Sequence, residues 1–133
     1  MISEMTPDEI LPGAREFLSS LKQAGYLIAL GSASKNAGII LTKVGLGDYF
    51  DAIVDGNIIT ASKPDPQVFL MGAELLGAAP SECVVFEDAI AGVEAAKAGG
   101  MKVVGIGAPA NLPGADLVIA GLNEMNLEQL EKL

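Results

Sequence analysis

The feature of this sequence that most constrains its fold is a regular alternation of short apolar runs with segments of helical periodicity. The apolar runs are Leu27–Gly31, Ala52–Val54, Cys83–Phe86, Lys102–Ile106 and Leu117–Ile119. The helical segments begin near Ala14 and then cover Asn36–Val44, Pro66–Leu76, Ala89–Ala98 and Asn126–Leu130. Phe69 is expected on the apolar face of its helix, Asn126 is expected to cap the last helix, and Gly99–Gly100 is expected to end the helix before it. Buried strands joined by helices are typical of parallel sheets that are covered on both sides. We therefore predict an α/β fold of three layers around a mostly parallel, Rossmann-like sheet.

Size and composition favour one globular domain. The chain has 133 residues, half of them hydrophobic, and no internal linker, so residues 1–133 are expected to form a single unit. The net charge of −9 and the dispersed Lys and Arg residues argue against a nucleic-acid partner. No apolar stretch is long enough for a membrane span, and the only cysteine, Cys83, is interpreted as a small core residue. We expect a cytoplasmic protein without a membrane partner.

Polar residues gather where the expected strands end, which is where ligands bind in parallel sheets. The first group, Ser32, Ser34, Lys35 and Asn36, follows an apolar run and opens a helix. Backbone amides, the helix dipole and side-chain donors at such a place suit an anion. The alternative is that Ser34 or Asn36 simply caps the helix.

Lys63 and the pair Glu87 and Asp88 are the other candidates. Lys63 lies in a loop stiffened by two prolines, where its ammonium group can oppose phosphate charge. A lysine before proline is more often an exposed loop residue, which is the alternative. Glu87 and Asp88 end a buried strand and can hold Mg²⁺, a cation that takes one or two carboxylates. The alternative is that Asp88 caps the next helix while Glu87 faces solvent.

Taken in order, these groups resemble the later motifs of the haloacid dehalogenase superfamily. The similar segments are Leu11–Gly13, Tyr49–Asp51, Ser62–Pro66, Phe86–Gly92 and Ala98–Gly105. Within the superfamily, Ser32–Asn36 and Ile53–Ala61 are most similar to the β-phosphoglucomutase group. The resemblance therefore covers nearly the whole chain, and the ordered combination is more specific than any single motif.

The resemblance implies a Mg²⁺-dependent phosphotransferase that interconverts a sugar 1-phosphate and a sugar 6-phosphate. In this reading Ser32 binds the phosphoryl group that is transferred, and Lys63 neutralises the same group. The implied ligands are Ser34, Lys35 and Asn36 for a second phosphate, and Glu87 and Asp88 for Mg²⁺. The expected partner is a small sugar phosphate.

One part of the family pattern is missing. The nucleophile and the acid/base of the family lie in an Asp-x-Asp-Gly segment after the first strand, and this sequence contains no such segment. Residues 1–12 instead resemble the linker that returns from the helical cap domain to the core. The resemblance thus predicts a sheet that lacks its central strand, in which Leu27–Leu30 and Val84–Phe86 become neighbours or accept a partner.

An inactive mutase core is the leading functional hypothesis, because a site without a nucleophile offers binding without turnover. Three alternatives remain open. A phosphatase core of the same superfamily would pass the phosphoryl group to water. A non-catalytic module would bind a partner or self-associate through an open sheet edge. A stand-alone enzyme would use Asp88 as its nucleophile.

Overall fold

The computed structural model describes residues 2–3, 14–32, 35–43, 45 and 47–133. Within them the chain forms a six-stranded sheet in the order β3-β2-β1-β4-β5-β6, and every pair of neighbouring strands runs parallel. The strands are β1 (Ile2–Ser3), β2 (Ala29–Gly31), β3 (Ala52–Val54), β4 (Val84–Glu87), β5 (Lys102–Ile106) and β6 (Leu117–Ile119). The α/β class and the parallel sheet predicted from the apolar runs are confirmed.

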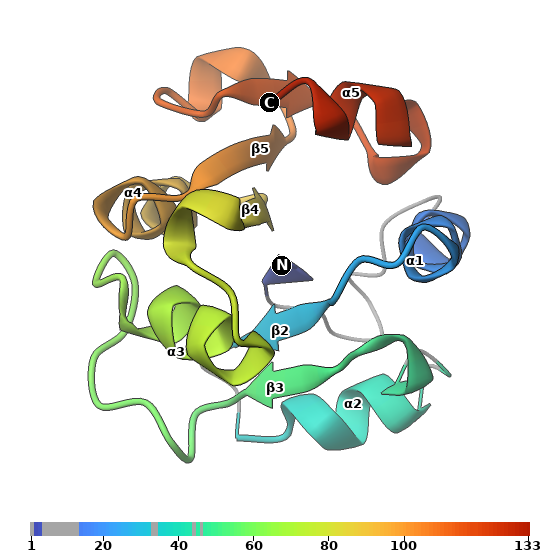
Figure 1. The fold of residues 1–133 in the computed structure, drawn as a ribbon. Helices are drawn as coiled ribbons and strands as arrows, with labels where there is room; N and C mark the ends of the chain where they lie inside the picture. The colour runs from blue at the N-terminus through green and yellow to red at the C-terminus, as the bar shows by residue number, and fades with distance from the viewer. Residues whose placement is uncertain (1, 4–13, 33–34, 44, 46) are drawn as a thin grey trace.

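Helices cover both faces of this sheet. The α-helices are α1 (Ala14–Gln23), α2 (Ala37–Lys43), α3 (Gln67–Leu76), α4 (Ile90–Ala98) and α5 (Leu127–Glu131), and short 3-10 turns lie at Gly47–Tyr49, Pro80–Glu82, Pro109–Asn111 and Leu122–Glu124. Helices α1 and α5 share one apolar core with the sheet, and α3 and α4 share the other (Figure 1). Helix α2 lies beside the edge strand β3. In the described part of the chain, no helix has the length and apolar character needed to cross a bilayer.

The central position of the sheet is occupied by the first residues of the chain. Ile2 lies opposite Leu30 of β2 and opposite Phe86 of β4, and Ser3 lies opposite Gly31. Figure 1 shows this short strand between β2 and β4. The prediction that the two flanking strands become direct neighbours is therefore wrong. Its physical basis was sound, because the two facing edges do need a partner, but two residues of the same chain supply one.

The helix ends agree with the sequence signals. The side chain of Asn126 accepts a hydrogen bond from the Gln129 amide at 2.8 Å, and the Gln129 side chain accepts from the Asn126 amide at 3.1 Å. This reciprocal pair is a capping box. Gly99 ends α4, and Gly100 follows it with a φ of 78° that favours glycine. The predicted cap and the predicted stop are both confirmed.

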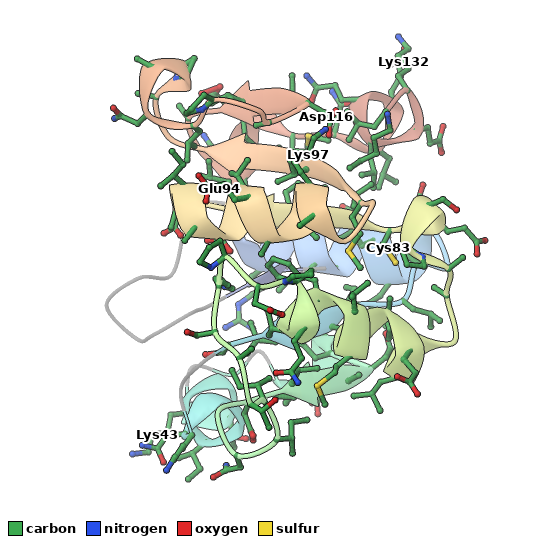
Figure 2. The ribbon with its side chains drawn as sticks, turned by 90° about the vertical axis from the view of Figure 1, so that its left-hand side faces the viewer. Lys43, Cys83, Glu94, Lys97, Asp116 and Lys132 are labelled. Carbon is green, nitrogen blue, oxygen red and sulfur yellow. The ribbon has the colours of Figure 1, made fainter. Side chains whose placement is uncertain are left out.

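Two aspartates, whose contacts the sequence did not predict, accept hydrogen bonds from backbone amides near the starts of β2 and β5. Asp51 accepts hydrogen bonds from Lys22 at 2.7 Å and from the Ile28 amide at 2.8 Å. Asp116 accepts from Lys97 at 3.1 Å and from the Val103 amide at 2.8 Å, and Figure 2 shows the Lys97 and Asp116 side chains side by side. Burial raises the pKa of each carboxyl, but these hydrogen bonds outweigh it and hold the pKa below its ordinary value.

These lowered pKa values predict an acid-sensitive contribution to stability. A carboxyl whose pKa is lower in the folded chain stabilises the fold above its unfolded pKa, near 4, and loses this effect as the pH falls through the folded pKa. We expect Asp51→Asn and Asp116→Asn each to lower the free energy of unfolding by about 1 kcal/mol or less at pH 7, because both sites are partly exposed. The deficit should shrink towards pH 3 in urea titrations.

A matched control is available at Glu131, an exposed carboxylate of α5. Glu131→Gln should change the free energy of unfolding at pH 7 by no more than about 0.5 kcal/mol, because substitutions of exposed side chains usually have small effects. A deficit in the two aspartate variants that stays constant from pH 7 to pH 3 would contradict the role of the ionised carboxylates.

Candidate active site

The polar residues singled out in the sequence follow two strands that flank the same central strand. Ser32 comes directly after β2, is 3% exposed, and donates its amide to the Val54 carbonyl at 2.8 Å. Glu87 is the last residue of β4, and Asp88 follows it. Because the strands are parallel, the carboxyl ends of β2 and β4 meet at one edge of the sheet. The structure thus places Ser32, Glu87 and Asp88 at a common edge, about two strand spacings, or ~10 Å, across.

Lys63 reaches this edge from the loop before α3. Its Nζ lies 3.0 Å from Oε2 of Glu87 in a salt bridge, with the side chains 13% and 2% exposed. The alternatives of an exposed loop lysine and a solvent-facing Glu87 are therefore both wrong. A nearly buried carboxylate and ammonium in contact are a costly arrangement to form, so they indicate a specific local role rather than general stabilisation.

The Glu87 carboxylate is held on its other side by the backbone. Oε1 accepts hydrogen bonds from the amides of Asp88 at 3.1 Å and Ala89 at 3.2 Å. Gly92 lies so close that a Cβ added there would overlap the carboxylate. The spacing of Glu87, Asp88 and Gly92 in the sequence thus has a steric cause. Helix α4 starts at Ile90, and its cap position is held by Ala89 rather than by Asp88, the residue considered as a cap from sequence.

Phe69 of α3 is a part of the site that the sequence analysis missed. The Nζ of Lys63 lies 5.1 Å from the centre of the Phe69 ring, within the range of a cation–π contact. The same ring packs against β2, since a Cβ added at Gly31 would lie 3.3 Å from it. Phe69 therefore links the loop of Lys63 to the strand that precedes Ser32. Its apolar helical spacing predicted a core residue, and nothing local to it indicated a cation above the ring.

A small cavity lies beside Lys63 and Glu87. It has a volume of about 220 Å³ and is lined by Ile59, Ser62, Lys63, Val68, Glu87, Ala89, Ala91 and Gly92. Lys63 and Glu87 thus meet in one hollow, with the Ser62 loop on one side and the start of α4 on the other. Neither Ser32 nor Asp88 is among the residues that line it, so the sequence-predicted groups share an edge of the sheet rather than a single closed pocket.

The carboxylate oxygens at this edge of the sheet provide some of the ligands that a hard cation requires. Glu87 is engaged by Lys63 and by two amides, whereas Asp88 is exposed and carries a carboxylate at the strand end. No group of three potential His, Cys, Asp or Glu ligands occurs in the part of the chain that the structure describes. Mg²⁺ usually takes one or two carboxylates and completes its shell with water and phosphate oxygens, so Asp88 can provide a protein ligand.

The group predicted for a second phosphate is described only in part. Ser34 lies outside the described residues. Lys35 and Asn36 are exposed and precede α2. The carbonyl of Lys35 accepts a hydrogen bond at 3.1 Å from the Asn57 side chain, which ties this segment to the loop after β3. The two described residues therefore lie on the surface near the carboxyl ends of β2 and β3.

Comparison with known proteins agrees with this architecture. The sequence profile of the haloacid dehalogenase-like hydrolases matches residues 1–100. The chain belongs to this family. It is 41% identical to the β-phosphoglucomutase of Bacillus subtilis over 132 residues, which is 99% of this chain and 58% of that protein. It is also 36% identical to hexitol phosphatase B of Escherichia coli, over 98% of this chain and 61% of that enzyme.

The fold comparison gives the same family. The crystal structure of β-phosphoglucomutase from Clostridium difficile superposes with a TM-score of 0.89 and 38% identity, covering 96% of this chain and 57% of that one. The chain thus spans about three fifths of the length of these relatives. What it shares with them is the family core, in which phosphatases and phosphoglucomutases use the same framework.

Proposed function

We propose that this chain forms the phosphate-binding part of a sugar-phosphate phosphotransferase core similar to that of β-phosphoglucomutase. The observation that carries the proposal is the Lys63–Glu87 pair at the carboxyl edge of the sheet, at a separation of 3.0 Å. A cation held at the strand ends by a buried carboxylate is suited to an anionic ligand, although the chain as a whole is strongly acidic. The similarity to β-phosphoglucomutases and to a hexitol phosphatase supports a sugar phosphate as that ligand.

In this proposal each side chain has a separate task. The Ser32 hydroxyl donates to an oxygen of the phosphoryl group, and the Lys63 ammonium neutralises its charge. Glu87 acts through Lys63, because its contact and the Phe69 ring fix where the ammonium group lies. Because the ammonium group is already in position, the Lys63 side chain does not have to rearrange when phosphate binds.

We also assign the cation and the second phosphate to this edge. Asp88 would hold Mg²⁺ directly, and Glu87 would support the site from beside it. When bound, the ion would offset the negative charge of the phosphate oxygens. The Ser34, Lys35 and Asn36 segment would hold the second phosphate of a sugar bisphosphate, which is what an intramolecular transfer through a bisphosphate requires.

We expect binding without turnover from this chain. The sequence contains no Asp-x-Asp-Gly segment, and covalent phosphoryl transfer needs a positioned carboxylate nucleophile. The absence of measurable hydrolysis of p-nitrophenyl phosphate would agree with this expectation. Robust hydrolysis that disappears in Asp88→Asn would instead identify Asp88 as a nucleophile and contradict it.

Calorimetric titration with inorganic phosphate in the presence of Mg²⁺ tests the binding site. We expect saturable binding to the unaltered chain and a loss of about tenfold or more in affinity for Lys63→Met, since a hydrogen bond to a charged group contributes about 1.5–3 kcal/mol. Lys132→Met is the matched control, because Lys132 is 73% exposed and directly follows α5. Equal affinity for all three proteins would contradict the assignment of Lys63.

A phosphatase core is the second candidate, because hexitol phosphatase B matches the same length of this chain. The two candidates differ in the acceptor of the phosphoryl group. A chimera that joins this chain to the amino-terminal part of the Bacillus subtilis relative should separate them. Isomerisation that depends on a sugar bisphosphate would favour the mutase, and simple release of phosphate would favour the phosphatase.

A further inference from the structure

Gln67, the first residue of α3, closes the loop that carries Lys63. Its Oε1 accepts hydrogen bonds from the backbone amides of Thr60 at 2.7 Å and Ala61 at 2.8 Å. Its Nε2 donates a hydrogen bond to the Thr60 hydroxyl at 2.8 Å. A single side chain thus bonds to two backbone donors and a hydroxyl that lie six and seven positions earlier in the chain.

These bonds serve the loop and not the helix on which Gln67 lies. Pro66 precedes α3 and forms no side-chain cap, and the backbone amide of Gln67 donates to Oδ1 of Asp65 at 2.9 Å. The Gln67 side chain therefore does not cap its own helix. Since two N–H donors meet at its oxygen and a hydroxyl lies at its nitrogen, the amide group matches its partners at both ends.

Lys63 lies inside the segment that Gln67 closes. Within this segment the Ser62 carbonyl accepts a hydrogen bond from the Asp65 amide at 3.0 Å, so the backbone turns tightly around Lys63. The segment is closed a second time by the bonds from Gln67 to Thr60 and Ala61. The Lys63 side chain therefore starts from a fixed backbone position.

Helix α3 gives Gln67 a rigid support. The next two residues, Val68 and Phe69, are buried, and a Cβ added at Gly31 would lie 3.0 Å from the first side chain and 3.3 Å from the second. The start of the helix is thus packed against β2, the strand that precedes Ser32. Because connecting loops are usually more mobile than the elements they join, a bond to a packed helix restrains this one.

We propose that Gln67 is a positioning residue for Lys63, because its amide group holds the loop in the conformation that directs the ammonium group to the carboxyl edge of the sheet. The inference rests on the proposed function, in which Lys63 binds the phosphoryl group. Gln67 acts through the lysine, since it is not among the described residues that line the cavity beside Lys63 and Glu87. A loop that is fixed before the anion arrives removes an ordering cost from binding.

NMR spectroscopy of the full chain tests the position of Lys63 without any ligand. The Nζ of Lys63 lies 5.1 Å from the centre of the Phe69 ring, so the ring should displace the proton resonance of the Lys63 ε-methylene group from that of exposed lysines. The signal is assigned by its loss in Lys63→Met. Gln67→Met, which has a similar size but no amide group, should return the resonance to the exposed value. Gln67→Glu, which keeps an acceptor oxygen for the two backbone amides, should retain most of the displacement.

Calorimetric titration with inorganic phosphate and Mg²⁺ tests the consequence for binding. We expect Gln67→Met to bind phosphate about fivefold more weakly than the unaltered chain, and Gln67→Glu to recover most of this loss. In a Lys63→Met background, Gln67→Met should have no further effect on affinity. An unchanged Lys63 resonance or an unchanged phosphate affinity in Gln67→Met would overturn the proposal.

Gln129→Met is the matched control. Gln129 of α5 also accepts a hydrogen bond from a backbone amide, that of Asn126 at 3.1 Å. Both glutamine variants should lower the free energy of unfolding in urea, but Gln129→Met should leave the Lys63 resonance and the phosphate affinity unchanged. An equal loss of affinity in Gln129→Met would overturn the proposal, because the effect would then be one of stability. If the unaltered chain did not bind phosphate, or bound it no better than Lys63→Met, the proposed function would fail, and the Lys63 resonance in Gln67→Met would still decide the role of Gln67.

Discussion

Replacement of Phe69 by alanine should lower the free energy of unfolding by about 3–5 kcal/mol, which is the usual cost of removing a buried aromatic ring. Phe69 is fully buried in the core shared by α3 and α4. The ring also lies between β2 and the Lys63 ammonium, so its loss leaves a cavity under the site. Because small domains are stable by only about 5–15 kcal/mol, the shift should be evident in urea unfolding.

Leu75→Ala provides the matched control for this variant. Leu75 lies on the same helix but is 58% exposed, so its truncation should cost less than about 0.5 kcal/mol. Phosphate titration of Phe69→Ala adds a second readout, since the ammonium of Lys63 would no longer rest on a ring. A loss of stability no larger than that of Leu75→Ala would contradict the packing of Phe69 against β2.

Replacement of Lys63 by methionine should lower the free energy of unfolding by about 2–3 kcal/mol, because it leaves the buried Glu87 carboxylate without its cation. This expectation is below the 3–5 kcal/mol typical of a fully buried pair, since Lys63 is 13% exposed and Glu87 keeps two backbone amide donors. The double variant Lys63→Met/Glu87→Gln should recover most of the loss, because glutamine is neutral and keeps an acceptor oxygen for those amides.

Lys132→Met is again the control, since its partner Glu128 lies one turn away and both side chains are mostly exposed. Its effect on the free energy of unfolding should be about 0.5 kcal/mol or less. If the double variant were no more stable than Lys63→Met, the cost would come from lost packing of the lysine stem rather than from an uncompensated charge.

The sequence was sufficient for the parts of this protein that depend on local pattern. Apolar runs and helical spacing predicted the strands that follow β1, and Asn126 and Gly99 predicted helix ends, because each signal lies within a few residues of its effect. Glu87 was found as a site residue through its motif, but its contact with Lys63 joins residues 24 positions apart. That contact depends on how α3 and α4 pack against each other, and no local sequence pattern specifies this packing.

The features that escaped prediction all join distant segments. Asp51 bonds to Lys22 across 29 positions, and Asp116 bonds to Lys97 across 19, so neither carboxylate has a local signal. β1 is two residues long, too short for a periodic pattern, and its place is determined by the two strands on either side. The position of β1 at the centre of the sheet therefore depends on pairing with distant segments and not on its local sequence.

The pairing of Ile2 with Phe86 also has a consequence for biosynthesis. These residues are adjacent in space but more than eighty positions apart in the chain. At about 5–20 residues per second, the ribosome would need several seconds between synthesising the first and the second. During that interval the edge of β1 that pairs with β4 would face the cellular milieu without its neighbour, so the nascent chain would be most open to chaperone capture before β4 emerges.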